Sequence, residues 1–336
     1  MSKIITIGSA SKDIFFPTRE GLFLDTPEDI LSQKKIAFEL GAKYHIEERF
    51  ESLGGCSVNV AAGLAKLGED VSCYASIGDD AIGKWIGREL QRMNVGVESV
   101  NIEKDCQSDL SSILVDINSA DRIIFSNQVA NKKLIFSSEK IGSPQWIFIG
   151  DLSGAWQENI DNIIEASRHK KCWLAFNPRQ KTIHEDVKKI IETITRCELL
   201  FVNKDEAIEI VCGCGDAPVR ELLENEEYLV RILHRLGAKT VTVTDGLRGA
   251  WGFDGHQLFH CESLKQEAVD TTGAGDAFTS GFFAARIKGM DLKSFLAWGI
   301  ANSSSSVMEY GGQKGLLTEA EINLQIDRIK IKSLNK

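Results

Sequence analysis

Proline is scarce in this chain, and long apolar runs are missing. The 336 residues include 5 prolines, which form no proline-rich linker, and we see no internal repeat or low-complexity tract. This absence argues against two domains joined by a flexible segment. No apolar run reaches the roughly 18 residues that a membrane-spanning helix needs. The first residues also lack the basic flank of a signal peptide, so we expect one cytoplasmic domain over residues 1–336, with no membrane partner.

Clustered basic residues and paired cysteine motifs are missing as well. The net charge of −9 argues against the broad basic surface with which proteins bind nucleic acid. The 8 cysteines are scattered, and Cys212 and Cys214 form the one pair with metal-ligand spacing. A structural zinc ion needs about four ligands, usually from two such pairs, so free thiols are expected. A small anionic nucleotide stays compatible with this composition, because a few amides and a metal can hold it.

The sequence does contain short β-rich apolar runs that alternate with longer segments of helical period. This alternation predicts an α/β protein in which helices cover both faces of a mostly parallel sheet. The expected strands are Ile4–Ile7, Val71–Ser76, Trp146–Ile149, Trp173–Phe176, Leu199–Val202 and Thr240–Thr244. The expected helices are Asn59–Lys66, Ile82–Asn94, Asn159–His169, Val187–Arg196, Asp205–Val211, Glu221–Leu236, Ala274–Lys288, Leu292–Tyr310 and Glu319–Ile329.

Two stretches interrupt this alternation. Phe15 to Ser52 is a long insertion after the first strand, and Ser111–Ile117 with Arg122–Ser126 has the pattern of a hairpin with its turn at residues 118–121. Long excursions inside a compact domain are often lids, so we expect segments of about 15–52 and 108–131 to form a small β-rich lid. A surface elaboration without a role is the alternative.

A glycine-rich turn from Asp270 to Asp276, followed by an apolar helix, is the strongest local signal. Backbone amides of Gly273, Ala274 and Gly275 at a helix N-terminus would hold the charge of a transferring phosphoryl group. Asp276 is a poor phosphate ligand, because like charges repel, but it is suited to accept a proton from an attacking hydroxyl. The alternative is an ordinary strand-to-helix turn whose first-turn carboxylate is favoured by the helix dipole.

Two other glycine motifs are excluded. Phe278 stands where a dinucleotide-binding fingerprint needs a third glycine or alanine. Residues 78–84 match most of the P-loop pattern, but the next residue is Trp85, which has no hydroxyl for magnesium. We interpret that second segment as the start of a helix.

The glycine turn and a second motif resemble the ribokinase or PfkB carbohydrate kinase family. The closing signature of that family is similar to DTTGAGDAFTSGF at 270–282, and its opening signature to GGCSVNVAAGLAKLG at 54–68. The resemblance extends from the first strand to about Gly312 and is weakest at 15–52. It implies a ribokinase-like three-layer αβα sandwich with a mostly parallel central sheet and a small β-sheet lid that closes over a sugar.

The resemblance implies roles for the first signature and for the end of the first strand. Asp13 falls where the family binds substrate hydroxyls, and a carboxylate is suited to accept two such hydrogen bonds. Gly54 and Gly55 would let the backbone approach the substrate, and Asn59 would offer a donor and an acceptor. A turn that caps a core helix is the alternative interpretation of these three residues.

The resemblance also implies ATP and Mg²⁺ as cofactors. Asn203 and Glu206 resemble an element of the family that orients Mg²⁺, here through water, although a helix N-cap with first-turn acids has the same sequence. Thr244 and Gly246 resemble the nucleotide-binding turn. Asn302 is a candidate for the adenine side, where the polarity of a helix face explains it almost as well.

A monovalent cation is a further expectation of the resemblance. Asp270 and Thr272 align with positions that hold such an ion in some relatives, so K⁺ is a candidate cofactor. The remaining ligands of this ion cannot be chosen from the sequence.

The sequence thus predicts a carbohydrate kinase that transfers the γ-phosphoryl of ATP to a hydroxyl of a sugar or sugar-like substrate. One alternative is a nucleoside kinase of the same family, in which aromatic residues of the insertion would stack on a base or else form the lid core: Phe15, Phe16, Phe23, Tyr44 and Phe50. Another is a catalytically idle binding protein of the family. A homodimer through the lid is the candidate assembly, and the particular sugar and hydroxyl stay open.

Overall fold

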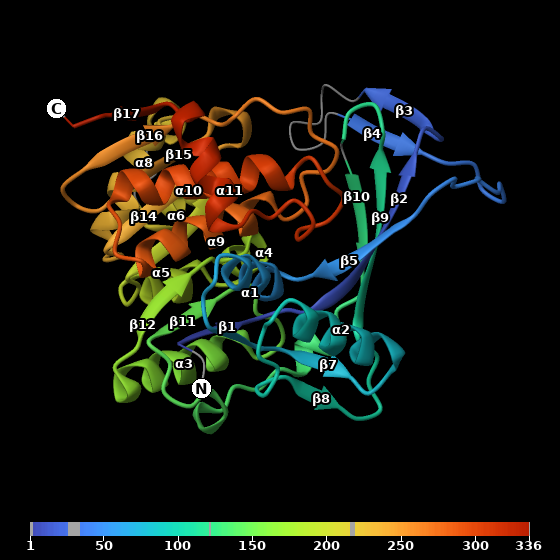
Figure 1. Ribbon diagram of the computed structural model, residues 1–336, viewed down its shortest axis with the longest axis horizontal. Coiled ribbons are helices and arrows are strands. Elements are labelled where there is room, and N and C mark those ends of the chain that lie inside the picture. The colour runs from blue at the N-terminus through green and yellow to red at the C-terminus, as the bar shows by residue number, and fades with distance from the viewer. Residues whose placement is uncertain (1–2, 26–33, 121, 216–218, 336) are drawn as a thin grey trace.

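A long twisted sheet runs through the centre of the protein, with helices on both faces (Figure 1). The structure is a computed structural model that describes residues 3–25, 34–120, 122–215 and 219–335. Within these ranges the main sheet has nine strands, in the order β17 (Ile331–Ser333), β16 (Leu258–Cys261), β15 (Ala250–Phe253), β14 (Thr240–Thr244), β13 (Leu199–Asn203), β12 (Trp173–Phe176), β11 (Trp146–Ile149), β1 (Ile4–Ile7) and β6 (Val71–Tyr74).

The strand directions divide this sheet into two parts. From β14 to β6 all neighbours are parallel, whereas β15, β16 and β17 extend the sheet with antiparallel pairs. The prediction of a mostly parallel sheet is confirmed. The antiparallel extension was not predicted from the sequence.

Side chains of the central strands alternate between two apolar layers. Ile4 and Trp146 pack on one face, whereas Ile5 and Ile147 pack on the other. The first layer is covered by α1 (Cys56–Lys66), α2 (Ala81–Arg92), α9 (Ala274–Ile287), α10 (Leu292–Ser306) and α11 (Glu319–Gln325). The second is covered by α3 (Trp156–Lys170), α4 (Gln180–Glu185), α5 (Val187–Ile194), α6 (Lys204–Gly213), α7 (Arg220–Leu223) and α8 (Glu226–Arg235). Burial on both faces explains why these strands are continuously apolar, and the three-layer sandwich is confirmed.

Several helix and strand boundaries differ from the expected ones. The helix predicted over Glu221–Leu236 is two helices, because the side chain of Asn225 accepts a hydrogen bond from the Tyr228 amide and starts α8. The strand predicted over Val71–Ser76 ends at Tyr74, and a short strand β7 (Ser76–Gly78) pairs separately with β8 (Asn101–Glu103). In the described part of the chain, we find no helix with the length and apolar character needed to cross a bilayer.

A second sheet projects from the carboxyl edge of the main one (Figure 1). This lid sheet has the order β10 (Arg122–Ser126), β9 (Asp109–Asp116), β2 (Ser11–Thr18) and β5 (Phe50–Gly54), and the hairpin of β3 (Leu22–Asp25) and β4 (Lys34–Ala37) lies at its far end. The predicted antiparallel hairpin of β9 and β10 is confirmed by its pairing. Residues 26–33 of the expected lid segment and Asp121 of the hairpin turn lie outside the described residues.

Candidate active site

Two adjoining cavities lie between the lid sheet and the carboxyl ends of the main-sheet strands. Ligands of open α/β sheets bind at this edge. The larger cavity has a volume of about 510 Å³ and the smaller of about 230 Å³. Six residues line both of them: Arg122, Arg179, Asn203, Glu206, Gly273 and Asp276. Asp276 therefore stands at the junction of the two spaces.

The glycine turn ends where α9 begins. Gly273 has a φ of 78° and is the N-cap of α9, and a Cβ there would lie 2.7 Å from the Cα of Gly312, so a larger residue does not fit. Gly275 lines the smaller cavity, whereas Ala274 lines neither described cavity. The Ala274 amide already donates to the Thr271 carbonyl at 3.3 Å. The predicted anion site therefore has fewer available amides than the sequence suggested.

Asp270 holds this turn from the protein interior. Its Oδ1 accepts hydrogen bonds from the amide and hydroxyl of Thr272, at 2.9 and 2.7 Å, and its Oδ2 accepts from the Gly311 amide at 3.0 Å. The side chain is fully buried, while Thr272 lines the larger cavity. Both carboxylate oxygens are engaged in fixing the turn. This geometry gives no support to the monovalent cation predicted at Asp270 and Thr272.

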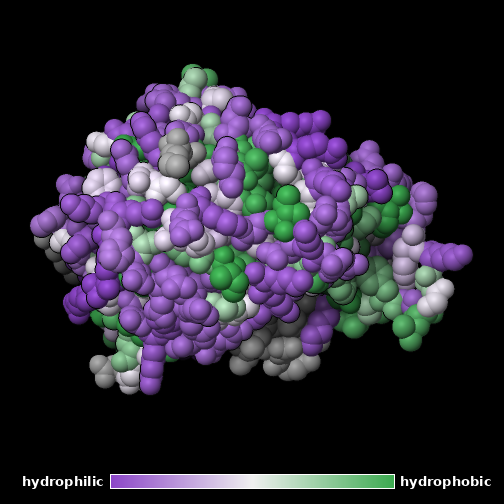
Figure 2. Space-filling model, turned by 90° about the horizontal axis from the view of Figure 1, so that it is seen from below, coloured by the Kyte–Doolittle hydropathy of each residue, from purple (hydrophilic) through white to green (hydrophobic). Residues whose placement is uncertain are grey.

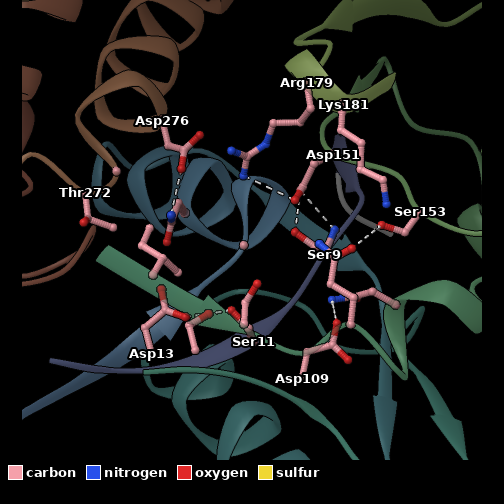
Figure 3. A pocket seen from close by; sticks show the side chains of 18 of the residues that line it. Ser9, Ser11, Asp13, Asp109, Asp151, Ser153, Arg179, Lys181, Thr272 and Asp276 are labelled. Carbon is pink, nitrogen blue, oxygen red and sulfur yellow. Dashed lines mark hydrogen bonds and ion pairs between the residues drawn. The ribbon is translucent and has the colours of Figure 1, made fainter. Parts of the chain in front are cut away.

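Asp276 extends from the first turn of α9 into the larger cavity (Figure 3). The Nδ2 of Asn59, on α1, donates a hydrogen bond to its Oδ2 at 2.7 Å. Burial raises the pKa of Asp276, while the charge of Arg179 and the hydrogen bond from Asn59 act in the opposite direction. Asn59, predicted as a substrate ligand, does line the larger cavity, but its amide also contacts the predicted base.

Asp13 lines the larger cavity from strand β2 of the lid sheet. The hydroxyl of Ser11 donates to its Oδ1 at 3.0 Å, and burial raises its pKa. Gly54 does not line either described cavity, but a Cβ there would lie 2.1 Å from a carboxylate oxygen of Asp13. Gly55 lines the larger cavity and has a φ of 97°. The two glycines thus make room for the carboxylate and for the turn into α1.

Asn203 and Glu206 form the N-terminal capping box of α6. The Oδ1 of Asn203 accepts from the Glu206 amide at 2.8 Å, and Glu206 Oε2 accepts from the Asn203 amide at 2.9 Å. The helix-cap interpretation is therefore observed, and both residues also line both cavities. Burial raises the pKa of Glu206 to about 7, against the charge of Arg179.

This donor set fits a magnesium ion that is held mainly by water and phosphate. Among the residues that the structure describes, we find no group of three or more His, Cys, Asp or Glu side chains arranged as a metal centre. Mg²⁺ sites of phosphoryl-transfer enzymes commonly use one or two carboxylates together with phosphate oxygens and water. Glu206 could supply such a carboxylate at the edge of the main sheet.

The three predicted nucleotide-binding residues lie in different surroundings. Thr244 lines the smaller cavity at the end of β14, whereas Gly246 lies in the following 3₁₀ turn with a φ of 45° and lines neither described cavity. Asn302 is fully buried: it donates to the Ala277 carbonyl at 2.9 Å and accepts from the Leu317 amide at 2.9 Å. We correct the prediction for Asn302, because its amide joins α9, α10 and the segment before α11.

Sequence reasoning missed three polar residues that follow strands. Ser9 follows β1, Asp151 follows β11 and Arg179 lies three residues after β12, and all three line the larger cavity. Asp151 accepts from the Ser9 hydroxyl and pairs with the Arg179 guanidinium at 3.3 Å (Figure 3). Asp151 also raises the pKa of Arg179, which keeps the guanidinium charged. Their position just beyond strand ends was the available signal.

Comparisons with known proteins agree with this geometry. At the level of sequence, the chain is 26% identical to the ATP-dependent 6-phosphofructokinase of Thermoanaerobacterium thermosaccharolyticum, covering 82% of this chain and 85% of that one. It is also 26% identical to the cytidine kinase of Thermococcus kodakarensis, covering 77% and 88%.

The fold has solved counterparts as well. The ribokinase of Arabidopsis thaliana, complexed with ribose and ATP, superposes with a TM-score of 0.76 at 20% identity, covering 97% of this chain and 98% of that one. Residues 32–319 match the family described as pfkB family carbohydrate kinase. The chain therefore belongs to the pfkB family of carbohydrate kinases, and it is a phosphotransferase that acts on an alcohol group.

Proposed function

We propose that this protein transfers the γ-phosphoryl of ATP to a hydroxyl of a sugar or sugar-like molecule, with Asp276 as the general base. The position of Asp276 carries this proposal. Two carboxylates line both cavities, but Glu206 is engaged in the capping box of α6, whereas Asp276 lies in the first turn of α9 beside the glycine turn. The larger cavity, with its polar lid-sheet residues, would hold the acceptor. The smaller cavity, at the helix N-terminus, would hold the phosphates.

The proposed reaction moves one proton and one phosphoryl group. Asp13 and Asn59 orient the acceptor, and Asp276 takes the proton of its hydroxyl as that oxygen bonds to the γ-phosphorus. The bond from the γ-phosphorus to the β–γ bridging oxygen breaks, and ADP leaves. Arg179 and the free amides of the first turn of α9 stabilise the charge on the equatorial oxygens. A Mg²⁺ ion near Glu206 and Asn203 would neutralise phosphate charge.

The cavity lining favours a sugar over a nucleoside. The described residues that line the larger cavity include no Phe, Tyr or Trp side chain on which a base could stack. Instead, Phe15 is buried in the lid core with Phe50, whose ring stacks on Tyr310 at 4.4 Å. Phe23 and Tyr44 are partly exposed and line neither described cavity. Phe15 and Phe50 thus support the lid-core interpretation, and Phe16 lines neither described cavity.

The lid sheet also offers a surface for a second copy of the chain. On strand β10, Ile123 and Phe125 are exposed and line neither described cavity, and Leu22 and Leu24 are exposed on β3. In Figure 2, hydrophobic side chains gather at the right end of the molecule, where Figure 1 places the lid. An edge strand with apolar side chains is a typical site of association, so we propose a homodimer through the lid. Sedimentation that gives a monomer mass at assay concentration would contradict it.

An acceptor screen tests the proposed function. Purified protein would be given ATP and Mg²⁺ with pentoses, hexoses, sugar phosphates and nucleosides, each with and without K⁺, while ADP formation is followed. We expect turnover with an unmodified sugar and its loss, by several powers of ten, in Asp276→Asn, which should still bind ATP. Preference for a nucleoside would support the second candidate. ATP and sugar binding without turnover would support an idle binding protein, and near-normal turnover of Asp276→Asn would refute the assigned base.

A further inference from the structure

The loop that follows α10 reaches the active site from behind Asn59. Its residue Gln313 donates from Nε2 to two acceptors, the Leu53 carbonyl at 3.0 Å and the Oδ1 of Asn59. Asn59 in turn donates from Nδ2 to Asp276 at 2.7 Å. Gln313 itself lines neither described cavity, so any effect on the reaction must pass through Asn59.

The donor and acceptor roles in this series of hydrogen bonds are fixed by the Leu53 carbonyl. A backbone carbonyl can only accept, so the NH₂ group of Gln313 must face Leu53, and the same group then meets Asn59. Asn59 must accept this hydrogen bond with its Oδ1, so its own NH₂ group faces Asp276. A rotated Asn59 amide would place two NH₂ groups together and its oxygen against a carboxylate, so both contacts would be lost.

The loop holds Gln313 firmly in this position. The Gly311 amide donates to Asp270, the residue that fixes the glycine turn, at 3.0 Å. A Cβ on Gly312 would lie 3.0 Å from the Asn59 side chain, so the loop backbone packs directly against that amide. Gln313 is thus anchored both to the turn that carries Asp276 and to strand β5 of the lid sheet.

We propose that Gln313 is a positioning residue, which fixes the orientation of the Asn59 amide and so presents a hydrogen-bond donor to the catalytic base. The inference rests on the proposed role of Asp276. A donor stabilises the ionised carboxylate, and an ionised carboxylate is the form that can take a proton from the acceptor hydroxyl. Gln313 therefore keeps the base active at lower pH than burial alone would allow.

Other charged and titratable groups also act on Asp276, and they stay in place when Gln313 is replaced. These groups are Arg179 after β12, Asp151 after β11, Cys56 on α1 and Glu206 on α6. If the midpoint of Asp276 titration changes when Gln313 is replaced, and the change depends on Asn59, it can therefore be assigned to the relay. By relay we mean the two hydrogen bonds that join Gln313 to Asn59 and Asn59 to Asp276.

The test measures the titration of Asp276 directly. The protein is labelled with ¹³C at aspartate carboxyl carbons, and the Asp276 signal is identified by its absence in Asp276→Asn. In Gln313→Met, which cannot donate, we expect the midpoint of this signal to move upward. Gln91→Met, on the exposed face of α2, is the matched control, and it should leave the midpoint of the Asp276 signal unchanged. An unchanged midpoint in Gln313→Met overturns the inference.

Two further variants separate positioning from a general loss of structure. Gln313→Leu is a second neutral side chain that cannot donate, so the same upward shift is expected here even if Gln313→Met fails to fold. In an Asn59→Ser background, Gln313→Met should add no shift of its own, because the relay is already broken. A full additional shift in that background would mean that Gln313 acts by another route, and would overturn the proposal.

Turnover with the acceptor found in the screen gives an independent readout. Gln313→Met should lower turnover about tenfold at acidic pH and less at alkaline pH, where the base is ionised without help. An equal loss at every pH would contradict the inference. Near-normal turnover of Asp276→Asn would instead refute the base itself, so failure of the proposed function and failure of this inference give different results.

Discussion

Gly54 and Asp13 lie against each other on the paired strands β5 and β2, with no space for a side chain between them. A Cβ on Gly54 would come within 2.1 Å of the Asp13 carboxylate oxygen. Gly54 has no positive φ, so the reason for glycine here is the neighbouring carboxylate and not the backbone conformation. The orientation of Asp13 in the larger cavity therefore depends on a residue that does not itself line that cavity.

Replacing Gly54 by alanine should therefore weaken acceptor binding. Asp13 has to turn away from the new methyl group, and we expect the KM for the acceptor to rise about tenfold or more while the KM for ATP changes little. Gly87→Ala is the matched control, because Gly87 lies in helix α2 with open space around it and the change should leave both constants unaltered. An unchanged acceptor KM in Gly54→Ala would contradict this coupling.

Asp13 itself should act mainly in binding. Asp13→Asn removes the charged acceptor of hydrogen bonds from sugar hydroxyls, so we expect the acceptor KM to rise about 10- to 100-fold. Steady-state kinetics would separate this from a loss of kcat, which should be smaller. A loss confined to kcat would place Asp13 in the chemical step and refute the binding role.

Asp276 should cost the protein stability at neutral pH. Burial raises its pKa above the unfolded value, so the stability that the protonated carboxyl provides is present at low pH and is lost as pH rises through the folded-state pKa. Asp276→Asn cannot ionise at this position, so it removes this loss of stability with rising pH. Its Tm should exceed that of wild type near neutral pH, and the difference should shrink toward about pH 4. Thermal denaturation across this range measures it, and a constant difference would contradict the assignment.

Arg179 should stabilise the transferring phosphoryl group. Arg179→Gln removes the charge at the junction of the cavities, and we expect turnover to fall about 100- to 1,000-fold, with a partial recovery in Arg179→Lys. Arg220→Gln, on the exposed helix α7, is the control for loss of an arginine. If Arg179→Gln raised only the acceptor KM, the guanidinium would belong to the acceptor site.

Glu206 should affect the metal requirement more than the fold. Glu206→Gln keeps an oxygen for the hydrogen bond from the Asn203 amide but loses the charge, so the capping box should persist. We expect a several-fold higher Mg²⁺ concentration for half-maximal activity, measured by titrating Mg²⁺ at fixed ATP. Unchanged metal dependence would leave Glu206 as a helix cap without a role at the metal.

The sequence predicted the local features well, because their causes are local. Apolar runs buried on both faces indicate parallel strands, and Gly273 marks a backbone position with positive φ at the start of a helix. The position of Asp276 in the first turn of that helix follows from the same few residues. The boundary at Asn225, the N-cap of α8, was not predicted, since a cap residue is easily hidden in a longer helical pattern.

By itself, then, the sequence determined the layered α/β fold, the glycine turn and the acid beside it, because backbone conformation and hydrophobic period are properties of neighbouring residues. The tertiary structure decided which polar atoms meet. It brought Asn59 to Asp276 across 217 positions, placed Arg179 between two cavities and enclosed Asn302 in a helix interface. These contacts depend on how whole layers pack, which no short stretch of sequence specifies.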